Sequence, residues 1–401
     1  MTQKRFLTII LSFILSINAL SQSLSDVFVI DKEHLTLVKQ KIKEGDKLLT
    51  KANMLLIKSA EKSLRISPYS VVNKEKESPS GDNHDYVSLA PYWWPNPDTK
   101  DSLPYIRKDG KRNPEISKFK DHKYLSDMAT NVQVLSLAYF ISDDEKYAIH
   151  AANLLKVFFL DGKTRMNPNM NYAQAIKGTN EGRGAGLIDS RHFIRVIESV
   201  NLLKGSENWQ DTDEVKLKKW FSDFLNWMQT SPNGIDEMDT PNNHGTWYDA
   251  QRLSFALFIG EMEQAKGIVN NAIKRLDNQM DKDGSFPKEL ARTTSLNYSC
   301  FNLHAFFIVA EMAERTGTDF WKLETPSMKS LQKGFDYIYP YLSKEKEWKG
   351  QQIKAFDYNS AAPLLLKASA KLNCNSCYKT FDKLGLKVDN RLLLLLVSEY
   401  K

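Results

Sequence analysis

Two short segments of the sequence carry side chains whose types and spacing suit acid–base chemistry. In the first, Asn243 and His244 stand where a polar loop turns into an apolar helical pattern. An amide, an imidazole and the free N–H groups of a helix start come together there, and such a group can hold an anion. In the second, Arg292 precedes Tyr298 by six residues, again just before an apolar helical pattern. An arginine binds carboxylates through parallel donors, and a tyrosine beside it can exchange a proton with a bound molecule.

Each segment also has a plainer structural explanation. Asn243 can cap the helix with His244 as an incidental neighbour, although capping alone does not account for the whole cluster of residues 241–249. Arg292 can pair with a carboxylate of the protein while Tyr298 packs against the core. Neither spacing is a strong pattern without the other.

Two long segments, 78–114 and 161–186, do not fit a helical pattern. The first contains six prolines and the second is rich in glycine and asparagine, so both are expected to be loops. Loops of this length inside a compact domain are usually functional. The first carries Tyr92, Trp93 and Trp94, which can form a stacking platform for sugar rings or an aromatic plug at one end of a helical array. Because the two tryptophans are adjacent, we expect them not to share one role.

The elements that must position these residues are helices. Between residues 124 and 140, apolar side chains recur at the offsets of one helical face. Similar patterns predict helices over residues 34–63, 147–158, 186–203, 213–228, 246–260, 264–280, 299–314, 331–342 and 361–372. Sustained strand patterns are scarce, and no repeat of fixed period is visible. We therefore expect an all-α fold, an incomplete (α/α) toroid or barrel of antiparallel helix pairs with long functional loops, in one domain spanning 22–401.

The composition is that of a globular protein. The 401 residues are 42% hydrophobic and 26% charged, which excludes a disordered chain. Three cysteines are too few for a disulfide-stapled miniature. Cys374 and Cys377 can form a tight disulfide in an oxidising compartment, whereas a zinc site would need two further ligands and none is spaced nearby. We interpret this pair as structural or incidental.

The N-terminal residues have the pattern of a cleavable signal peptide. Lys4 and Arg5 precede an apolar run over residues 6–19, which is too short to span a bilayer as a helix of about 20 residues. A small-residue cleavage site follows at residues 19–21, so we expect residues 1–21 to be removed; the alternative is a buried N-terminal helix. No cysteine lies near the site to anchor a lipoprotein. We expect a periplasmic or secreted protein without a membrane span.

Taken together, the two chemical segments resemble the alginate lyase-like polysaccharide lyases, helical-toroid enzymes that cleave uronic-acid polymers by β-elimination. The resemblance is carried by Asn243-His244 and by Arg292 with Tyr298. It is supported by residues 86–95, 171–176 and 182–184, and it extends over roughly residues 80–305. It implies that these four residues form the catalytic set, that no metal or other cofactor is required, and that the partner is an anionic uronic-acid polysaccharide or oligosaccharide rather than a nucleic acid.

The same resemblance suggests substrate contacts. The candidates from the loops and the helix start are Tyr92, Trp93, Trp94, Asn171, Tyr172, Gln174, Arg183, Trp247 and Tyr248. Gln174 and Arg183 can bind neighbouring uronates, although hydrogen bonds within their own loop would explain them equally well. His192 falls within a predicted helix, and we interpret it as structural. The other histidines show no metal-ligand spacing.

The chemistry of β-elimination gives each residue of the catalytic set a role. The proton on C5 is weakly acidic beside a charged C6 carboxylate, so Arg292 and the Asn243 amide are expected to neutralise that carboxylate. Tyr298 then protonates the departing O4, and a nearby Arg292 is expected to lower the pKa of Tyr298 enough for it to share the role of base. In mannuronate the C5 proton and O4 lie on one face, so Tyr298 can do both; in guluronate they lie on opposite faces, and His244 is the candidate base.

Two other functions fit parts of the same pattern. Asp236, Glu237 and Asp239 form an acidic cluster that can serve an inverting glycoside hydrolase on an α/α toroid, although a solvated loop has the same composition. A non-catalytic protein that binds acidic glycans would need the aromatic residues and arginines only. The formal net charge is +6, and it falls to +4 without Lys4 and Arg5, too small to indicate a polyanion by itself. We expect alginate as the substrate, with glucuronan next.

Overall fold

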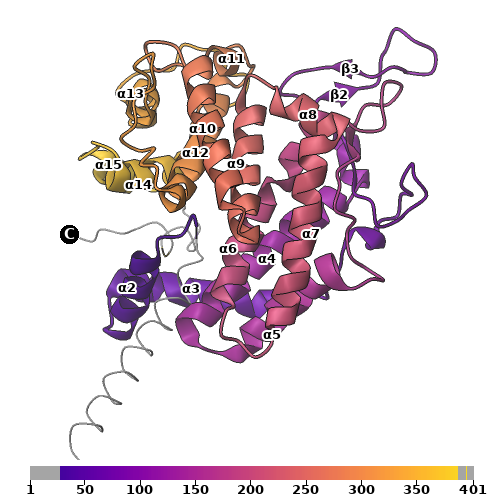
Figure 1. The fold of residues 1–401 in the computed structure, drawn as a ribbon. Helices are drawn as coiled ribbons and strands as arrows, with labels where there is room; N and C mark the ends of the chain where they lie inside the picture. Colours follow the sequence, from indigo (N-terminus) through magenta and orange to yellow (C-terminus); the bar gives the residue numbers. More distant parts are fainter. Residues whose placement is uncertain (1–27, 387–393, 395–401) are drawn as a thin grey trace, which may run out of the picture.

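The computed structural model describes residues 28–386 and residue 394. The predicted signal peptide, residues 1–21, lies outside the described residues. Within them the chain is mostly helical, as predicted, and the helices form two layers (Figure 1). No helix of this part is long and apolar enough to cross a membrane.

An inner layer holds the core of the molecule. It consists of helices that pack each on the next, in the order α4 (Asp121–Ser142), α6 (Phe193–Leu202), α9 (Asn243–Ile259) and α12 (Ser295–Ala313). Helix α9 is buried along almost its whole length, from Gly245 to Phe258. A helix that is shielded on all sides must lie inside the protein, which is why its apolar residues do not form a single stripe.

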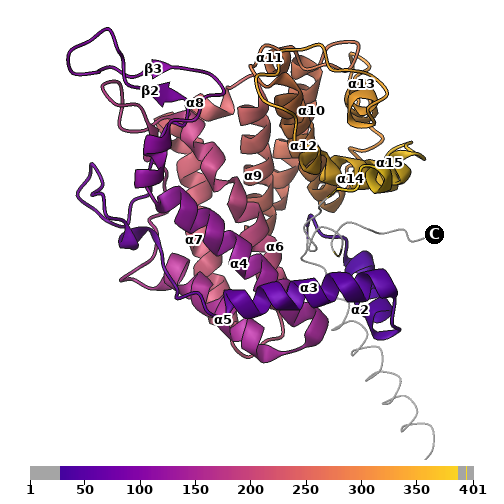
Figure 2. The same ribbon diagram turned by 180° about the vertical axis from the view of Figure 1, so that it is seen from behind.

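An outer layer covers these helices with amphipathic partners. Each outer helix contacts an inner one, and the layer comprises α3 (Lys47–Ser63), α5 (Glu145–Leu155), α7 (Asp211–Thr230), α10 (Met262–Gln279), α13 (Leu331–Leu342) and α14 (Ala362–Lys371). The helical array has two ends, formed by α2 (Lys32–Lys43) with α3 and by α13 with α14. Both ends lie on the same side of the molecule (Figures 1 and 2). The predicted all-α, incomplete toroid is thus confirmed.

The two predicted loops contain short strands. Strand β1 (Val87–Leu89) pairs in parallel with β4 (Tyr172–Ala175), and β2 (Trp93–Trp94) pairs antiparallel with β3 (Ile106–Arg107). These pairs fix the two long loops beside the helix starts. The prediction of loops without regular structure was therefore incomplete, because strands of two to four residues leave no periodic pattern in the sequence.

Several helix boundaries differ from those predicted. Residues 34–63 form two helices, because Gly45 adopts a left-handed φ of 85° and Asp46 caps a new helix. The first half of 186–203 is a 3-10 segment, η4 (Gly184–His192). Helices α9 and α12 begin three and four residues earlier than predicted. Asn243, His244 and Tyr298 therefore lie in first helical turns rather than in loops, whereas Arg292 lies in the short segment before α12.

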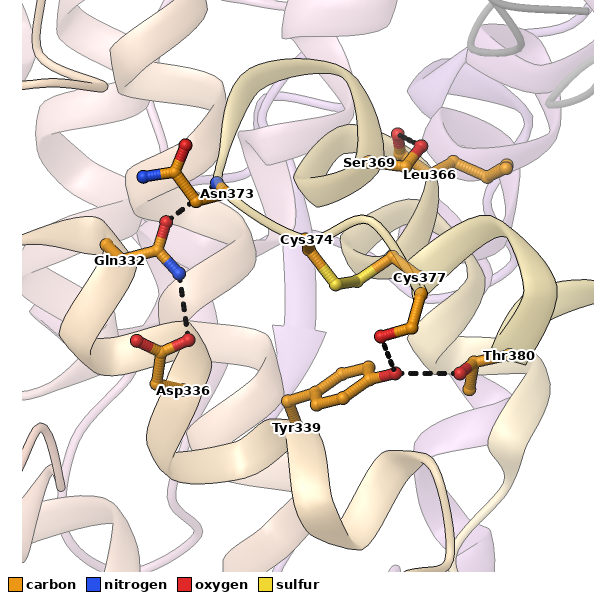
Figure 3. The surroundings of a disulfide bond; sticks show 10 residues. Gln332, Asp336, Tyr339, Leu366, Ser369, Asn373, Cys374, Cys377 and Thr380 are labelled. Atoms are coloured by element: carbon orange, nitrogen blue, oxygen red, sulfur yellow. Dashed lines mark hydrogen bonds between the residues drawn. A yellow bond between two sulfur atoms is a disulfide. The ribbon is translucent and has the colours of Figure 1, made fainter. Parts of the chain in front are cut away.

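The remaining elements are short. They are η1 (Val71–Asn73), η2 (Pro114–Lys118), η3 (Lys156–Leu160), α8 (Pro232–Met238), α11 (Pro287–Leu290), η5 (Glu314–Thr316), η6 (Tyr358–Ala361) and α15 (Cys377–Lys383). Cys374 and Cys377 form a disulfide at the turn from α14 to α15, where Tyr339 of α13 bonds to Ser376 and Thr380 (Figure 3). The bridge thus closes a turn that already packs on α13.

Candidate active site

One cavity of about 940 Å³ collects most of the candidate residues. It lies at the N-terminal ends of α9 and α12 and is bordered by α8, η4, the start of α4 and both long loops. Eight predicted residues line it: Tyr92, Trp93, Gln174, Arg183, Asn243, His244, Arg292 and Tyr298. Of the charged side chains described in its wall, seven are cationic and three acidic: Arg107, Arg112, Lys120, Lys123, Arg183, Arg191 and Arg292 against Asp189, Asp236 and Glu237. The wall is suited to an anionic ligand.

Asn243 is the first residue of α9 and is held by a buried carboxylate. Its backbone N–H donates to Glu289 Oε1 (2.6 Å) and its Nδ2 donates to Glu289 Oε2 (2.8 Å). Asn242, rather than Asn243, caps the helix by accepting from the backbone N–H of His244 (2.9 Å). The capping explanation of Asn243 is therefore wrong. Burial raises the pKa of Glu289, and the bonds from Asn243 oppose that rise.

His244 forms a hydrogen-bonded pair with a second buried carboxylate. The distance from His244 Nδ1 to Glu237 Oε1 is 2.7 Å, and the Glu237 side chain is 2% exposed whereas that of His244 is 21% exposed. When Nδ1–H donates a hydrogen bond to this carboxylate, Nε2 is the acceptor nitrogen of a neutral imidazole. The next residue, Gly245, has no room for a Cβ between Arg275 and Thr240. Close packing thus fixes the turn that carries the imidazole.

Arg292 is clamped by Asp109, a residue of the first long loop. Arg292 Nε donates to Asp109 Oδ2 (3.1 Å) and Nη2 to Asp109 Oδ1 (2.7 Å). Thr293 adds bonds to Asp109 from its backbone N–H (3.2 Å) and its hydroxyl (3.0 Å). Burial would raise the pKa of Asp109, but the bonds and charge of Arg292 outweigh it and hold that pKa well below its usual range. The structural alternative for Arg292, a pair with a protein carboxylate, is therefore observed.

Tyr298 lies in the first turn of α12 and contacts both Arg292 and Tyr92. Arg292 Nη2 donates to Tyr298 Oη (2.7 Å), and Tyr298 Oη donates to Tyr92 Oη (3.0 Å). Burial and the neighbouring Tyr92 raise the pKa of Tyr298 well above its usual value, although Arg292 acts to lower it. The prediction that Arg292 lowers this pKa overall was therefore wrong, because desolvation of the phenol is the larger effect.

The C-terminal third of the chain holds the start of α12. The backbone N–H of Ser295 donates to Gln351 O (2.9 Å) and that of Leu296 to Gln352 Oε1 (3.3 Å). Trp348 Nε1 donates to Ser295 Oγ (2.9 Å). These bonds satisfy N–H groups that a helix start leaves free. A region without any recognisable motif thus positions Tyr298.

Gln174 and Arg183 form a second polar group on β4 and the residues after it. Gln174 has a left-handed φ of 51°, a strained conformation for this residue type that is often found at functional sites. Its Nε2 donates to Asp189 Oδ1 (3.1 Å), and its Oε1 accepts from Arg183 Nη2 (2.9 Å). Asp189 also accepts from Tyr86 and Ser88 (both 3.0 Å). Hydrogen bonds within the loop therefore orient this pair at the cavity wall.

Five predicted contact residues do not line the cavity. Trp94 Nε1 donates to Lys111 O, as expected if adjacent strand residues point to opposite faces. Asn171 Oδ1 accepts from Trp227, and Tyr172 pairs with Val87 in the strand ladder. Trp247 is buried against Phe301, and Tyr248 is fully buried with its hydroxyl bonded to Met228 O (2.7 Å). The prediction that Trp247 and Tyr248 contact the substrate was wrong, because α9 carries both into the core.

The structure also adds residues that sequence reasoning did not single out. They are the carboxylates Asp109, Asp189 and Glu289 and the arginines Arg112 and Arg191. Their contacts join positions up to 183 residues apart, so no local spacing could reveal them. His192 does not line the cavity; burial lowers its pKa, and its Nδ1 bonds to Arg195. Among residues 28–386 and 394, no group of three histidine, cysteine or acidic side chains is placed to hold a metal ion.

Comparison with known proteins gives a consistent result. The family model described as alginate lyase matches residues 70–348. A solved alginate lyase from Bacteroides ovatus is 36% identical, with a TM-score of 0.88 over 94% of this chain and 100% of that chain. Alginate lyase A1-III from a Sphingomonas species is 16% identical, with a TM-score of 0.58 over 94% and 98% of the two chains, and shares the fold. A variant of A1-III complexed with a tetrasaccharide gives 16% and 0.59 over 94% and 97%. No curated protein matches the chain.

Proposed function

The chain belongs to the alginate lyase family and is a polysaccharide lyase; we propose that it cleaves alginate by β-elimination in the cavity between the starts of α9 and α12. One observation carries the mechanism. His244 and Tyr298 stand on the first turns of two neighbouring helices, and each is oriented by its own partner, Glu237 or Arg292. A candidate base and a candidate acid thus border one cation-rich cavity.

We assign the role of base to His244. Its Nδ1 is bonded to Glu237, so Nε2 is the nitrogen that can accept the proton from C5 of the uronate. The electron pair of the C5–H bond forms the C4–C5 double bond as the bond from C4 to the glycosidic oxygen breaks. The carboxylate of Glu237 stabilises the resulting imidazolium, as a carboxylate does in other acid–base pairs.

We assign the role of acid to Tyr298. Because burial and Tyr92 raise its pKa, the phenol is protonated in the free enzyme and can give its proton to the departing O4. The tyrosinate that remains is stabilised by Arg292 Nη2, which already bonds to Oη. Transfer of the C5 proton from His244 back to Tyr298 through water then restores both residues.

The reacting carboxylate needs charge neutralisation, and Arg292 can supply it in part. Its Nε and Nη2 are bonded to Asp109 and Tyr298, so only Nη1 is left for the substrate within the described structure. The sequence suggested a bidentate contact between Arg292 and the substrate carboxylate. The structure leaves a contact through Nη1 alone. Further donors are the cavity-lining amide of Asn243 and Arg183.

A substrate panel tests the proposal. Alginate, polymannuronate, polyguluronate and glucuronan are incubated with the enzyme, and the near-ultraviolet absorbance of the new C4–C5 double bond is followed. We expect absorbance with alginate. Polymannuronate and polyguluronate are both included because the base and the acid are assigned to different residues, His244 and Tyr298. Release of reducing sugar without absorbance would support an inverting hydrolase, and retention without product would support a glycan-binding protein. Glu237, one of the three carboxylates that the hydrolase alternative depends on, is already bonded to His244, which disfavours the hydrolase.

We also propose that the enzyme is exported. The support is the sequence pattern of Lys4, Arg5 and the apolar residues 6–19. N-terminal sequencing of the mature protein from a secreting host tests it, with Gln22 as the expected first residue. An uncleaved N-terminus would contradict export through this signal.

A further inference from the structure

Arg191 differs from most other cations of the cavity wall in lacking an acidic partner. Arg292 and Arg107 are paired with Asp109. Lys120 is paired with Glu75, Lys123 with Asp127, and Arg183 is bonded to Gln174. In the described part of the chain no carboxylate lies within ion-pair distance of Arg191, and the same holds for Arg112, which is exposed. Within the same part of the chain Arg183 also lacks a carboxylate partner, but its guanidinium is bonded to Gln174. Arg191 is therefore a shielded cation of the wall that is bonded neither to a carboxylate nor to another side chain of the described residues.

The guanidinium of Arg191 is held in place by two contacts. Its Nη1 donates to the carbonyl of Ile188 (2.8 Å), and its central carbon lies 5.8 Å from the centroid of the Phe301 ring. Nε and Nη2 make no hydrogen bond within the described residues, and neither belongs to the polar atoms that are sealed from solvent. Both Arg191 and Phe301 line the cavity. Donors on a fixed guanidinium thus remain available to a ligand.

The surroundings make an anion the favourable ligand. Burial lowers the pKa of Arg191, and Asp189 acts against that effect from beyond ion-pair distance. An arginine keeps its charge even so. The carboxylate of Asp189 already accepts bonds from Tyr86, Ser88 and Gln174. A desolvated cation without a direct counter-charge is costly, and a bound carboxylate would offset that cost.

The position of Arg191 places this ligand next to the reaction. Phe301 follows Tyr298 by three residues on α12, so the two side chains lie one helical turn apart. Trp247 packs under Phe301 with ring centroids 4.9 Å apart. The Arg191 guanidinium, whose central carbon lies 5.8 Å from the centroid of the same Phe301 ring, therefore borders the cavity near the acid Tyr298.

We propose that Arg191, supported by Phe301, forms a subsite for the carboxylate of the uronate that neighbours the reacting one. The proposal rests on the proposed lyase function. It assigns to Arg191 substrate binding and not bond cleavage, because the reacting carboxylate must lie beside Asn243, Arg292 and Tyr298.

Steady-state kinetics on alginate oligosaccharides tests the subsite. We expect Arg191→Gln to raise KM by about 10- to 100-fold, the equivalent of one charge-assisted hydrogen-bonded contact, while kcat changes by less than about 3-fold. Arg191→Lys should recover part of the loss. KM of the wild-type enzyme should rise more steeply with NaCl concentration than KM of Arg191→Gln, because one ionic contact has gone. Arg65→Gln, at an exposed position outside the cavity, is the matched control and should leave KM unchanged.

A purely structural role for Arg191 gives a different result. If the side chain only supports Phe301 and Ile188, Arg191→Met should lower both Tm and kcat and should leave KM unchanged. The subsite instead predicts that Arg191→Met keeps Tm close to the wild-type value while KM rises, because an unpaired buried charge has been replaced by an apolar chain of similar length. An unchanged KM in both variants, with unsaturated product still formed by the wild type, overturns the subsite alone. Absence of that product from the wild type overturns the proposed function instead.

Discussion

Asp109 and Arg292 are joined by two parallel hydrogen bonds although 183 residues separate them in sequence. The pair ties the first long loop to the segment before α12. Gly110 follows with a left-handed φ of 72°, and a Cβ at this position would collide with the side chain of Thr293. The loop can therefore approach Arg292 this closely because residue 110 is glycine. The position of Arg292, a candidate catalytic residue, depends on a loop that carries Tyr92 as well.

Asp109→Asn should weaken this link while keeping the size of the side chain. We expect kcat/KM to fall by about 10-fold or more, because Arg292 loses its charged partner. Burial is the largest cause of the raised pKa of Tyr298, and the negative charge of Asp109 adds to it. Removal of that charge lowers the pKa of Tyr298, so the alkaline limit of activity, where the acid loses its proton, should move to lower pH. A pH profile of kcat/KM measures both effects; a shift of this limit to higher pH contradicts the arrangement.

Tyr298→Phe should remove the proton donor. We expect kcat to fall by on the order of 10²- to 10⁴-fold with the fold intact, as for the loss of a general acid. Tyr92→Phe is the matched control: it removes the hydroxyl that accepts from Tyr298 Oη but leaves the acid in place, so its kcat should remain far above that of Tyr298→Phe. Near-wild-type activity of Tyr298→Phe would show that another group protonates O4.

Glu237→Gln should disrupt the orientation of His244. An amide at this position can donate to Nδ1, which forces the proton onto Nε2 and removes the base. We expect a fall in kcat on the order of 10²- to 10⁴-fold, with KM little changed. Asp236→Asn serves as the control, because Asp236 also lines the cavity but is not the partner of His244. Equal losses in the two variants would indicate a general electrostatic effect in place of a specific pair.

The fold was largely predictable because long amphipathic and fully apolar helices leave a strong periodic pattern. The predicted helix over 331–342 matches α13 residue for residue. Helix α12, in contrast, begins at Ser295 through bonds to Gln351 and Gln352, partners that come from a distant part of the chain. The strands β1 and β4 depend in the same way on pairing across 85 residues. A local sequence pattern cannot indicate where an element begins or ends when that boundary depends on partners so far away in the chain.

The candidate catalytic residues could be predicted from the sequence, whereas the residues that hold them in place could not. Asn243, His244, Arg292 and Tyr298 all line one cavity, as the resemblance implied. The carboxylates that hold them come from separate elements, such as Glu289 for Asn243 on a four-residue helix. The sign of the pKa shift of Tyr298 depended on burial, which a sequence does not report for a single side chain.

Removal of the disulfide by Cys374→Ser with Cys377→Ser should affect stability only slightly. The loop that it closes is very short, with a sequence separation of three, so the entropy that it removes from the unfolded chain is worth at most about 2 kcal/mol. None of the described residues that line the cavity comes from α14 or α15. We therefore expect a small decrease in Tm and unchanged kcat and KM, measured by calorimetry and the absorbance assay. A large loss of activity at a temperature where the variant is folded would contradict the inference that the disulfide does not influence the cavity.

Glu198 should make the stability of the protein depend on pH. Its buried carboxyl group accepts the backbone N–H groups of Phe28, Val29 and Ile30 at 3.0 to 3.2 Å. Burial raises the pKa of Glu198 from 4.5 to about 7, and these three bonds oppose the rise. A raised pKa means that the folded state binds the proton more tightly than the unfolded state. This contribution to stability is complete below pH 4.5 and is lost as pH rises towards 7, on the order of 3 kcal/mol in total.

Glu198→Gln tests this dependence, because glutamine keeps an acceptor oxygen but does not titrate. The Tm of the wild type minus that of the variant should decrease between about pH 5 and pH 8 and then level off. Other titrating groups, such as the buried His304 with its pKa lowered by burial to about 4, are common to both proteins and cancel in the difference. A difference in Tm that stays constant over this range would mean that Glu198 keeps an ordinary pKa and that residues 28–30 are bonded to an ionised carboxylate throughout this pH range.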